Sequence, residues 1–492
     1  MRSVYNILLL SVAFATTVAN AQTEGSSFTL TGMGVATPWA RDYQCVGINP
    51  ANLDLDPRYE TKVALGLLEG GISLYSAALT KEQVRQNIFQ EEVAEFTLEQ
   101  QRDFAKEFAN SANAVDVEIT HFGLSIRTER LGTFAFRTRE RASFYYELSE
   151  QASELLWLGY GSNYWDSLVV SENTIETVIP NSPNLDQATY DKVVRGFTDT
   201  VNAQLLSEFL NGTHFKMNWV REFNLSWGKK IWSNEDDIQI HAGLGAKLLI
   251  GQGLLAVDVE DGNTQVFSAL SPIFQIDYGV SDENPSSLPE NAGKLTPVGM
   301  GIGFDIGTTL VWKDRIFLSA AVNDIGSMTW DGNVYVLNDS HVIETKNDGI
   351  ESTDFISQIE GLNGSDAVLD WTGSTSLTTK LPTTFRLGLG MENHPAYKVG
   401  IDFIMPLNDG VASMEKPVIA IGGEFSPIKN IHLQAGLVQG GNYDVKIPVG
   451  IYFTLGRQGG YEFGIASRDL ITFFSRNQPT VSVAFGFLRF RF

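Results

Sequence analysis

The sequence has little cysteine, little charge and no long hydrophobic run, and each shortage excludes a class of protein. A single cysteine, Cys45, among 492 residues excludes an intramolecular disulfide. Charged residues make up 19% of the chain, below the roughly 25% that is usual for soluble domains. Beyond the N-terminal stretch there is no run of about 18 apolar residues, so the sequence predicts no membrane-spanning helix.

Catalytic and metal-binding patterns are missing as well. The six histidines show no metal-ligand spacing, and no glycine-rich phosphate loop or calcium loop is present. No serine, histidine and acidic residue form a recognisable nucleophile pattern. The formal net charge of −23 argues against nucleic acid as a partner. We therefore expect no enzyme, no cofactor and no metal site.

The first 21 residues have the pattern of a secretory signal peptide. Arg2 gives a positive start, an apolar stretch runs from Ile7 to Ala15, and small residues end at Ala21. The apolar stretch is too short to act as a membrane anchor. We expect cleavage after Ala21.

Strict alternation of apolar and polar residues fills the second half of the chain. In "TFRLGLGMEN" every second residue from Phe385 to Met391 is apolar. In "QIHAGLGAKLLIG" His241 and Lys247 fall between the apolar positions, and His432 has a similar place in "NIHLQAGL". This period is typical of half-buried antiparallel strands, in a soluble sandwich or in a membrane barrel.

Three features favour the membrane barrel: the predicted export signal, strand segments of about ten residues, and aromatic residues near segment ends. We expect an all-β transmembrane barrel over residues 61–492. Without its two insertions, the length leaves room for about 14 antiparallel strands. The aromatic residues expected at the membrane interfaces are Trp227, Trp312, Tyr397, Tyr461 and Phe492.

Two insertions, at about residues 80–114 and 146–210, interrupt the strand pattern with helix formers. Their charged faces exclude them from lipid, so we expect both outside the membrane. They would either cap the barrel or act as a gate or a docking element for a partner. In the second insertion, one helix face over Asp186–Leu210 is expected to carry Tyr190, Val194, Phe197, Val201, Leu205 and Phe209.

The last residues continue the strand pattern. Leu488, Phe490 and Phe492 fall on one face, and small Gly486 and Ala484 continue that outward set. We expect this strand to pair with the first strand and close the barrel. The opposite, inward faces predict a lumen lined by both signs of charge, with Lys247, Asp305, Arg386, Asp402 and Arg489 as the candidate lumen residues.

Several stretches resemble the FadL and PorV superfamily of outer-membrane barrels. "LTGMGVATPWARDYQCVGINPANLDL" resembles its opening, in which a glycine-rich segment precedes Asn-Pro-Ala, here Asn49, Pro50 and Ala51. "GMGIGFDIGTTLVWKDRIFLSAAVNDIG" and "KLPTTFRLGLG" resemble its later strands. "LGTFAFRTRER" looks like an uncharacterised branch of Bacteroidetes type. The apolar residues Leu488, Phe490 and Phe492 resemble the C-terminal signal read by the barrel-assembly machinery.

The resemblance implies an N-terminal hatch over residues 22–60 inside the barrel, anchored at Asn49 and Pro50. Irregular backbone at membrane depth is stable only when buried in protein or lining a cavity, which a hatch satisfies. The alternative is an Asn-Pro turn outside the membrane.

The implied function is passage of a small hydrophobic or amphipathic compound across the outer membrane of a Gram-negative bacterium. The alternative is a non-transporting scaffold or secretion-system accessory barrel that docks a protein partner. Outer-membrane lipid and the barrel-assembly machinery are the further partners expected.

Overall fold

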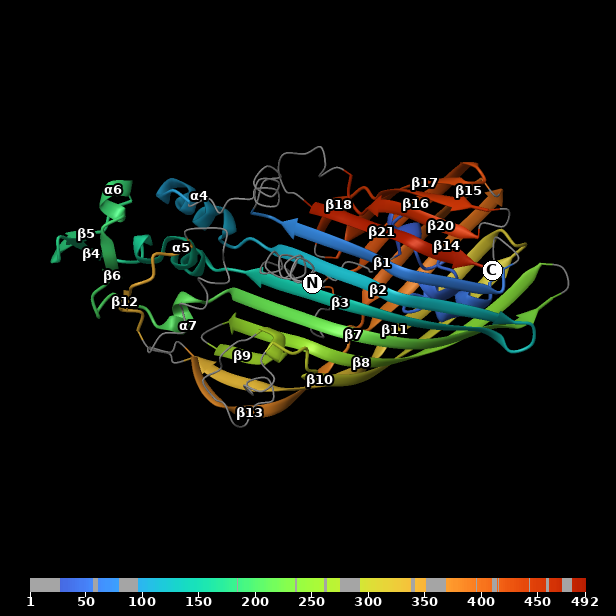
Figure 1. Cartoon of the computed structure of the whole chain (residues 1–492), viewed down its shortest axis with the longest axis horizontal. Coiled ribbons are helices and arrows are strands. Elements are labelled where there is room, and N and C mark those ends of the chain that lie inside the picture. The colour runs from blue at the N-terminus through green and yellow to red at the C-terminus, as the bar shows by residue number, and fades with distance from the viewer. Residues whose placement is uncertain are drawn as a thin grey trace.

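Alternating apolar residues form 14 antiparallel strands that close into a barrel in the computed structural model of the chain (Figure 1). Among the described residues, each strand pairs with the next around the ring, and the last pairs with the first from Ala64 opposite Arg491 to Tyr75 opposite Thr480. This confirms the predicted fold class and strand number. A closed ring leaves no strand edge exposed to lipid. The ring comprises β1 (Val63–Ser76), β2 (Asn113–Thr128), β3 (Gly132–Glu147), β7 (Thr213–Ser233), β8 (Ile238–Glu260), β10 (Gly299–Trp312), β11 (Ile316–Leu337), β14 (Thr384–His394), β15 (Tyr397–Pro406), β16 (Val418–Ile428), β17 (Ile431–Gly440), β19 (Val449–Leu455), β20 (Tyr461–Ser467) and β21 (Thr480–Arg491).

The structure describes residues 27–55, 61–78, 96–183, 185–234, 237–260, 263–274, 293–337, 341–350, 369–394, 396–408, 414, 416–441, 443–456, 460–470 and 480–492. The predicted signal peptide lies outside these residues, as does most of the first half of the first predicted insertion. None of the described helices has the length and apolar character needed to cross a membrane. Further elements beside the ring are β9 (Asn263–Leu270), η4 (Pro272–Phe274), β13 (Leu369–Lys380) and β18 (Tyr443–Lys446).

The two ends of the barrel differ in the length of their connections. Short turns, such as residues 129–131 and 313–315, join strands at the end that carries the C-terminus in Figure 1. Longer connections, such as residues 148–212, lie at the opposite end. We call these the turn end and the loop end. In outer-membrane barrels short turns face the periplasm and long loops face outward, which orients this chain.

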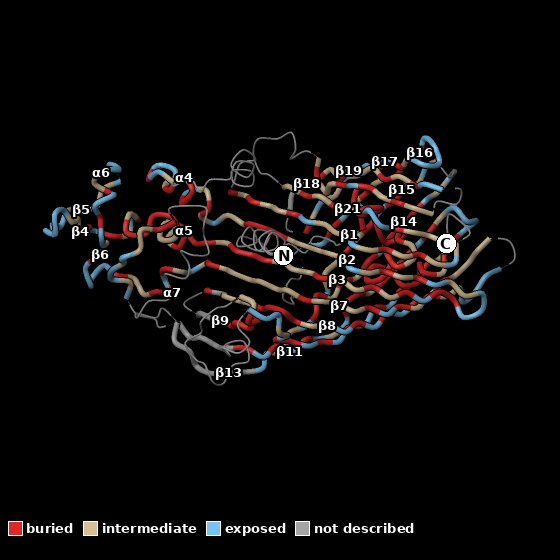
Figure 2. Tube along the Cα trace, in the orientation of Figure 1, coloured by how far each residue is buried: buried red, intermediate tan, exposed pale blue. Residues whose placement is uncertain are grey.

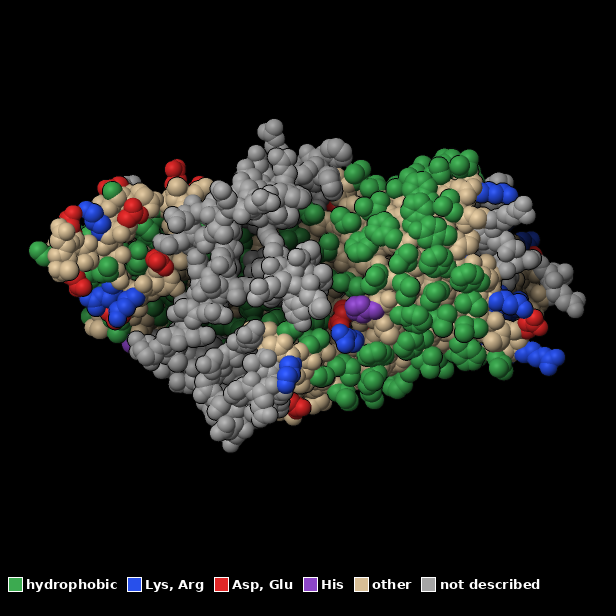
Figure 3. All heavy atoms as spheres, in the orientation of Figure 1, with side chains coloured by type: hydrophobic (Ala, Val, Ile, Leu, Met, Phe, Trp, Pro, Cys, Tyr) green, Lys and Arg blue, Asp and Glu red, His purple; other side chains and the backbone are tan. Residues whose placement is uncertain are grey.

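A band of apolar side chains covers the outside of the barrel in Figure 3, with charged side chains gathered at its two margins. Outward residues on strands around the ring are apolar and exposed, for example Leu244, Ile302 and Ile421, which are 53%, 57% and 52% exposed. Aromatic residues with exposed side chains, including Trp312 and Tyr397, lie where these strands meet the turn end. A band of this kind fits the hydrocarbon layer of a membrane. The chain is therefore an outer-membrane type of β-barrel.

A small folded unit, the loop-end module, extends from the loop end of the barrel (Figure 1). Its core stacks aromatic rings, with the Trp157 ring centroid 4.8 Å from Phe104 and 5.0 Å from Phe108. Helix α4 begins at a capping box in which the Thr97 hydroxyl and the Gln100 side chain exchange hydrogen bonds with backbone N–H groups. The module contains α4 (Leu98–Phe108), α5 (Glu150–Leu158), η3 (Gly159–Gly161), β4 (Ser167–Glu172), β5 (Ile175–Pro180), α6 (Gln187–Tyr190), β6 (Val193–Phe197), α7 (Leu206–Phe209) and β12 (Glu344–Thr345).

The continuous helix predicted over Asp186–Leu210 is wrong. Only the short helices α6 and α7 form there, and β6 between them joins a four-stranded sheet in the order β12–β6–β4–β5. Gly196 lies at the middle of β6 against the Trp165 ring, where a side chain would collide. Val201, expected on the apolar face of that helix, is 89% exposed. Tertiary pairing with β4 has overridden the helical spacing of the apolar residues.

The last strand, β21, shifts its register against β20 near its end. Two residues of β21, Phe487 and Leu488, stand opposite one residue of β20, and both are exposed. This is the arrangement of a β-bulge. Phe492 points outward as predicted, but Gly486 and Ala484 do not continue the outward set. They are buried and face the inside of the barrel, because the bulge reverses the alternation.

Candidate functional site inside the barrel

The N-terminal part of the described chain lies inside the barrel. Residues 27–55, which we call the inner segment, contain the short helical turns α2 (Phe28–Thr31), η1 (Asp42–Cys45) and η2 (Pro50–Asp54), and no strand. Nearly all its residues are buried, and buried residues concentrate in the half of the barrel toward the turn end (Figure 2). The inner segment lies within the range predicted to form a hatch, while its movement stays a prediction.

The Asn49-Pro50-Ala51 motif holds one turn of the inner segment against the barrel wall. The fully buried Asn49 accepts a hydrogen bond from the Ala51 N–H at 3.2 Å. Its Nδ2 donates to the Thr309 hydroxyl of β10 at 3.0 Å. Pro50 suits the first position of η2, where no backbone donor is needed. These contacts hold the motif against the inner face of the barrel wall, and its role as the anchor of a hatch stays a prediction.

Glycines on the inner face of the wall leave room for the inner segment. A side chain at Gly243 would collide with the backbone of Pro50, and one at Gly390 with the Trp39 ring. Glycine inside a strand is expected where another part of the chain approaches closely. The inner segment is thus seated on wall backbone. Such glycines are Gly66, Gly123, Gly228, Gly243, Gly307, Gly388, Gly390, Gly400, Gly422, Gly436, Gly450 and Gly486.

Asp402 holds a second point of the inner segment. Its Oδ2 accepts the backbone N–H of Ala36 at 2.7 Å and that of Thr37 at 2.9 Å. Hydrogen bonds to an ionised carboxylate are about twice as strong as neutral ones. Arg386, on the neighbouring strand β14, is also buried. Both residues lie on the inner face, as the alternation predicts.

A layer of buried charges covers the side of the inner segment that faces the loop end. Arg137 donates to the Val46 carbonyl at 3.2 Å, so the layer rests directly on the segment. Arg139, two residues further along β3, pairs with Glu118 of β2 at 3.2 Å and with Glu222 of β7 at 2.9 Å. We call this the ionic layer. Its cations are neutralised by carboxylates of adjacent strands, which burial requires.

Lys247 and two aspartates continue the ionic layer across the lumen. The Lys247 ammonium lies 2.9 Å from Asp305 and 2.7 Å from Asp324, and its side chain is completely buried. Asp305 also accepts the Asp324 backbone N–H at 3.0 Å. Lys247 and Asp305, two of the candidate lumen residues, are thus buried and paired with each other, and a lumen function for them stays a prediction.

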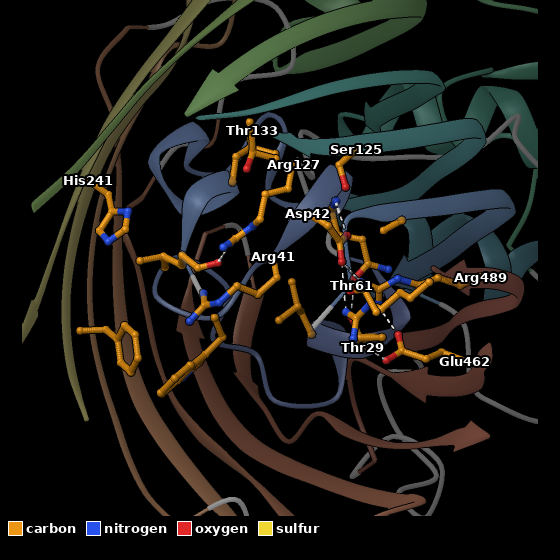
Figure 4. A pocket seen from close by; sticks show the side chains of 18 of the residues that line it. Thr29, Arg41, Asp42, Thr61, Ser125, Arg127, Thr133, His241, Glu462 and Arg489 are labelled. Carbon is orange, nitrogen blue, oxygen red and sulfur yellow. Dashed lines mark hydrogen bonds and ion pairs between the residues drawn. The ribbon is translucent and has the colours of Figure 1, made fainter. Parts of the chain in front are cut away.

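A cup of about 310 Å³ lies on the other side of the inner segment, at the turn end (Figure 4). Arg41 reaches into it from the inner segment, with its guanidinium 5.3 Å from the Phe317 ring centroid. Figure 4 shows His241 on the opposite wall. The lining combines apolar side chains such as Leu53 with charged ones such as Glu392. The cup thus offers apolar surface and charge together.

One wall of the cup joins the inner segment to the closing pair of strands. Arg489 of β21 lies 2.6 Å from Asp42 of the inner segment and 2.6 Å from Glu462 of β20. Arg491 pairs with the same two carboxylates, at 3.0 Å and 2.9 Å. Figure 4 shows Asp42, Arg489 and Glu462 grouped on one side of the cup. The predicted lumen residue Arg489 is therefore part of an ionic clamp.

A much smaller cavity of about 30 Å³ lies on the loop-end side of the ionic layer. That volume is on the order of a single water molecule. Its lining includes Arg141 and Glu222 from the ionic layer and apolar walls from Leu249, Met328 and Trp330. In the described residues the inner segment and the ionic layer together separate this cavity from the cup.

Sequence reasoning missed several residues that hold this arrangement. Arg137, Arg139 and Arg141 occupy alternate positions of "LGTFAFRTRER", a spacing that places all three on one face of a strand. Asp42 and Tyr43 belong to a segment without periodicity, and no pattern in the sequence marks their partners.

The chain belongs to a family of unknown function, DUF5723, which matches residues 55–433. The search of curated proteins found no match. Similar solved structures include a deletion mutant of TodX, a monoaromatic hydrocarbon channel, at 10% identity and a TM-score of 0.47 over 96% of this chain and 99% of that one.

The Pseudomonas putida toluene transporter TodX aligns at 11% identity and a TM-score of 0.40, covering 97% of this chain and 99% of that one. A Pseudomonas aeruginosa FadL homologue aligns at 11% identity and a TM-score of 0.39, covering 94% and 97%. The chain is thus similar to FadL-type barrels.

Proposed function

We propose that the barrel passes a small hydrophobic or amphipathic compound across the outer membrane, and that the inner segment is its gate. The observation that carries the proposal is the way the inner segment closes the lumen. Within the part of the chain that the structure describes, it forms no strand pairing with the wall and is held by side-chain hydrogen bonds, ion pairs and contacts with glycine backbone. A closure of this kind can be displaced without breaking the barrel ladder.

The character of the cup supports the substrate class. The cup presents the apolar side chains of Leu53 and Phe317 beside the guanidinium of Arg41. A compound with an apolar body and a polar group would find partners for both parts there. Sites for small molecules commonly combine apolar walls with a few polar groups.

The test replaces the anchor of the gate. The double variant Asn49→Ala, Pro50→Ala removes the Thr309 hydrogen bond and the fixed start of η2. We expect faster uptake into proteoliposomes of an alkylbenzene and of a medium-chain aliphatic acid than with the wild type. A hexose of similar size reports whether the opening is unselective.

The control is a second double variant, Asn202→Ala, Pro183→Ala, which replaces one asparagine and one proline at exposed positions of the loop-end module. This control should leave uptake unchanged. A folded gate variant with wild-type uptake of all three compounds would show that the inner segment does not gate passage.

A further inference from the structure

The outermost strand of the loop-end module is unpaired along one side among the described residues. Strand β5 is the last in the sheet order β12–β6–β4–β5 and pairs only with β4. Five of its six residues are exposed. Figure 1 shows the β4–β5 hairpin at the tip of the molecule farthest from the C-terminus. An unpaired strand edge is a template for pairing with another chain.

The turn of this hairpin determines which backbone groups face outward. Asn173 and Thr174 have φ of 49° and 70°, as a two-residue type I′ turn requires. In such a hairpin the flanking pair, Glu172 and Ile175, is the hydrogen-bonded one, and the pairs alternate from there. The backbone N–H and C=O groups of residues 176 and 178 therefore point away from β4.

The hairpin is held rigidly in place by the rest of the module. Leu168 of β4 is fully buried, and Ile179 of β5 packs on the same core. The Asn181 side chain, directly after β5, donates to the carbonyls of Ser162 at 2.8 Å and Trp165 at 2.9 Å. A partner strand would thus meet an edge that is already ordered, which lowers the entropy cost of binding.

Charge and side-chain type indicate the partner. Strand β5 has one acidic side chain, Glu176, and no Lys or Arg, whereas Glu172 at the end of β4 already pairs with Lys192 at 2.9 Å. Ile175 and Val178 are apolar and 69% and 60% exposed. A second copy of this chain would add the Glu176 carboxylate of its own β5 to the edge, and like charges on paired strands are unfavourable. A strand with basic and β-branched residues would complement both features.

We propose that β5 binds an extended segment of another protein, with alternating basic and β-branched residues, as an added fifth strand of this sheet. Main-chain hydrogen bonds supply affinity in this mode of recognition and side chains supply specificity. The inference does not depend on passage through the lumen, because the hairpin lies in the loop-end module.

The test uses the full chain in lipid nanodiscs and a fluorescent seven-residue peptide that alternates lysine and valine. Fluorescence anisotropy should show saturable binding. Val178→Pro removes an N–H from the free edge without removing a hydrogen bond to β4, and should weaken binding at least about tenfold. Val178→Thr keeps the N–H and the branched side chain, and should bind within about threefold of the wild type.

Glu176→Lys tests the charge without altering the backbone and should also weaken binding. Equal binding by the wild type, Val178→Pro and Glu176→Lys would overturn the proposal, and so would failure of the wild type to bind. If the wild type instead forms a dimer that Val178→Pro abolishes, the occupant is a second copy, and the proposed partner is wrong.

Discussion

The Tyr43 hydroxyl occupies the space that a side chain would need at Gly66 of β1. The same hydroxyl donates a hydrogen bond to Glu69 on that strand. The guanidinium of Arg489, on the neighbouring strand β21, lies 5.5 Å from the centre of the Tyr43 ring. The inner segment therefore packs against both strands at the closing seam of the barrel.

Replacing Gly66 with valine should displace the inner segment. The new side chain overlaps Tyr43, and overpacking of this kind costs roughly 1–3 kcal/mol. We expect a lower unfolding temperature and a larger single-channel conductance in planar bilayers. Gly71→Ala is the matched control on the same strand, because its Cβ would meet its nearest neighbour at 3.6 Å, an ordinary contact. If both variants had the same conductance, the close packing of Tyr43 on Gly66 would not be needed to keep the inner segment in place.

The alternation of apolar residues predicted the strands, and the length of the segments, the aromatic residues near their ends and the expected export signal favoured a membrane barrel over a soluble sandwich. One face of every strand meets lipid, so the period of two is strongly imposed and survives in a single sequence. Leu389 and Ile401 are exposed as predicted, and Asp402 is buried. The strand number followed from the chain length without the two insertions, divided by an average length for one strand and its connection. The estimate holds because the connections at the turn end are short.

The meaning of the inward glycines was not predictable from the same pattern. Gly390 and Gly400 fall on the predicted inner face. A side chain at either position would collide with the ring of Trp39, which is more than three hundred residues away in the sequence. The partners of Arg137 and Arg139 likewise depend on the register between strands. Local pattern identifies which face a residue occupies, whereas the pairing of strands decides what it contacts.

Asp402→Asn should loosen the inner segment at Ala36 and Thr37 while the barrel stays closed. The amide oxygen still accepts a hydrogen bond, but the charge that strengthens both bonds is lost, at a cost of roughly 1 kcal/mol or more. Hydrogen exchange followed by mass spectrometry should show faster exchange in residues 30–40. The control is a peptide from β8, whose exchange should stay slow. Unchanged exchange at Ala36 and Thr37 would mean that Asp402 does not hold the segment.

Lys247→Met should destabilise the barrel strongly, because Asp305 and Asp324 then lose their shared cation inside the protein. Removing one partner of a buried ion pair costs about 3–5 kcal/mol. Urea unfolding in detergent, followed by tryptophan fluorescence, measures the change. Lys346→Met, at an exposed position, should alter the free energy of unfolding by no more than about 0.5 kcal/mol.

Adding Asp305→Asn to Lys247→Met should recover part of the loss, since one uncompensated carboxylate is removed. A double variant as unstable as the sum of the two single variants would show that the residues are not coupled.

Asp42 and Arg489 should be energetically coupled across the boundary between the inner segment and the closing strand. Their charged groups lie 2.6 Å apart and are mostly buried, so each single replacement leaves a charge with one partner fewer. A double-mutant cycle of Asp42→Asn and Arg489→Met should give a coupling free energy of about 0.5–3 kcal/mol. The pair Lys62 and Glu129, both exposed and 3.2 Å apart, is the control, with an expected coupling of about 0.2–1 kcal/mol.

The same variants can be compared by their rates of folding into lipid vesicles and of unfolding. These rates distinguish two roles for the ionic clamp of Asp42, Glu462 and Arg489. If Asp42→Asn slows the closing of β21 against β1, the inner segment is in place when the seam forms. If the variant alters only the rate of unfolding, the barrel closes first and the segment docks afterwards. In that case the inner segment can leave and return in a closed barrel, as a gate requires. A slower folding rate with unchanged unfolding would argue that the segment is a permanent part of the seam, and would count against gating.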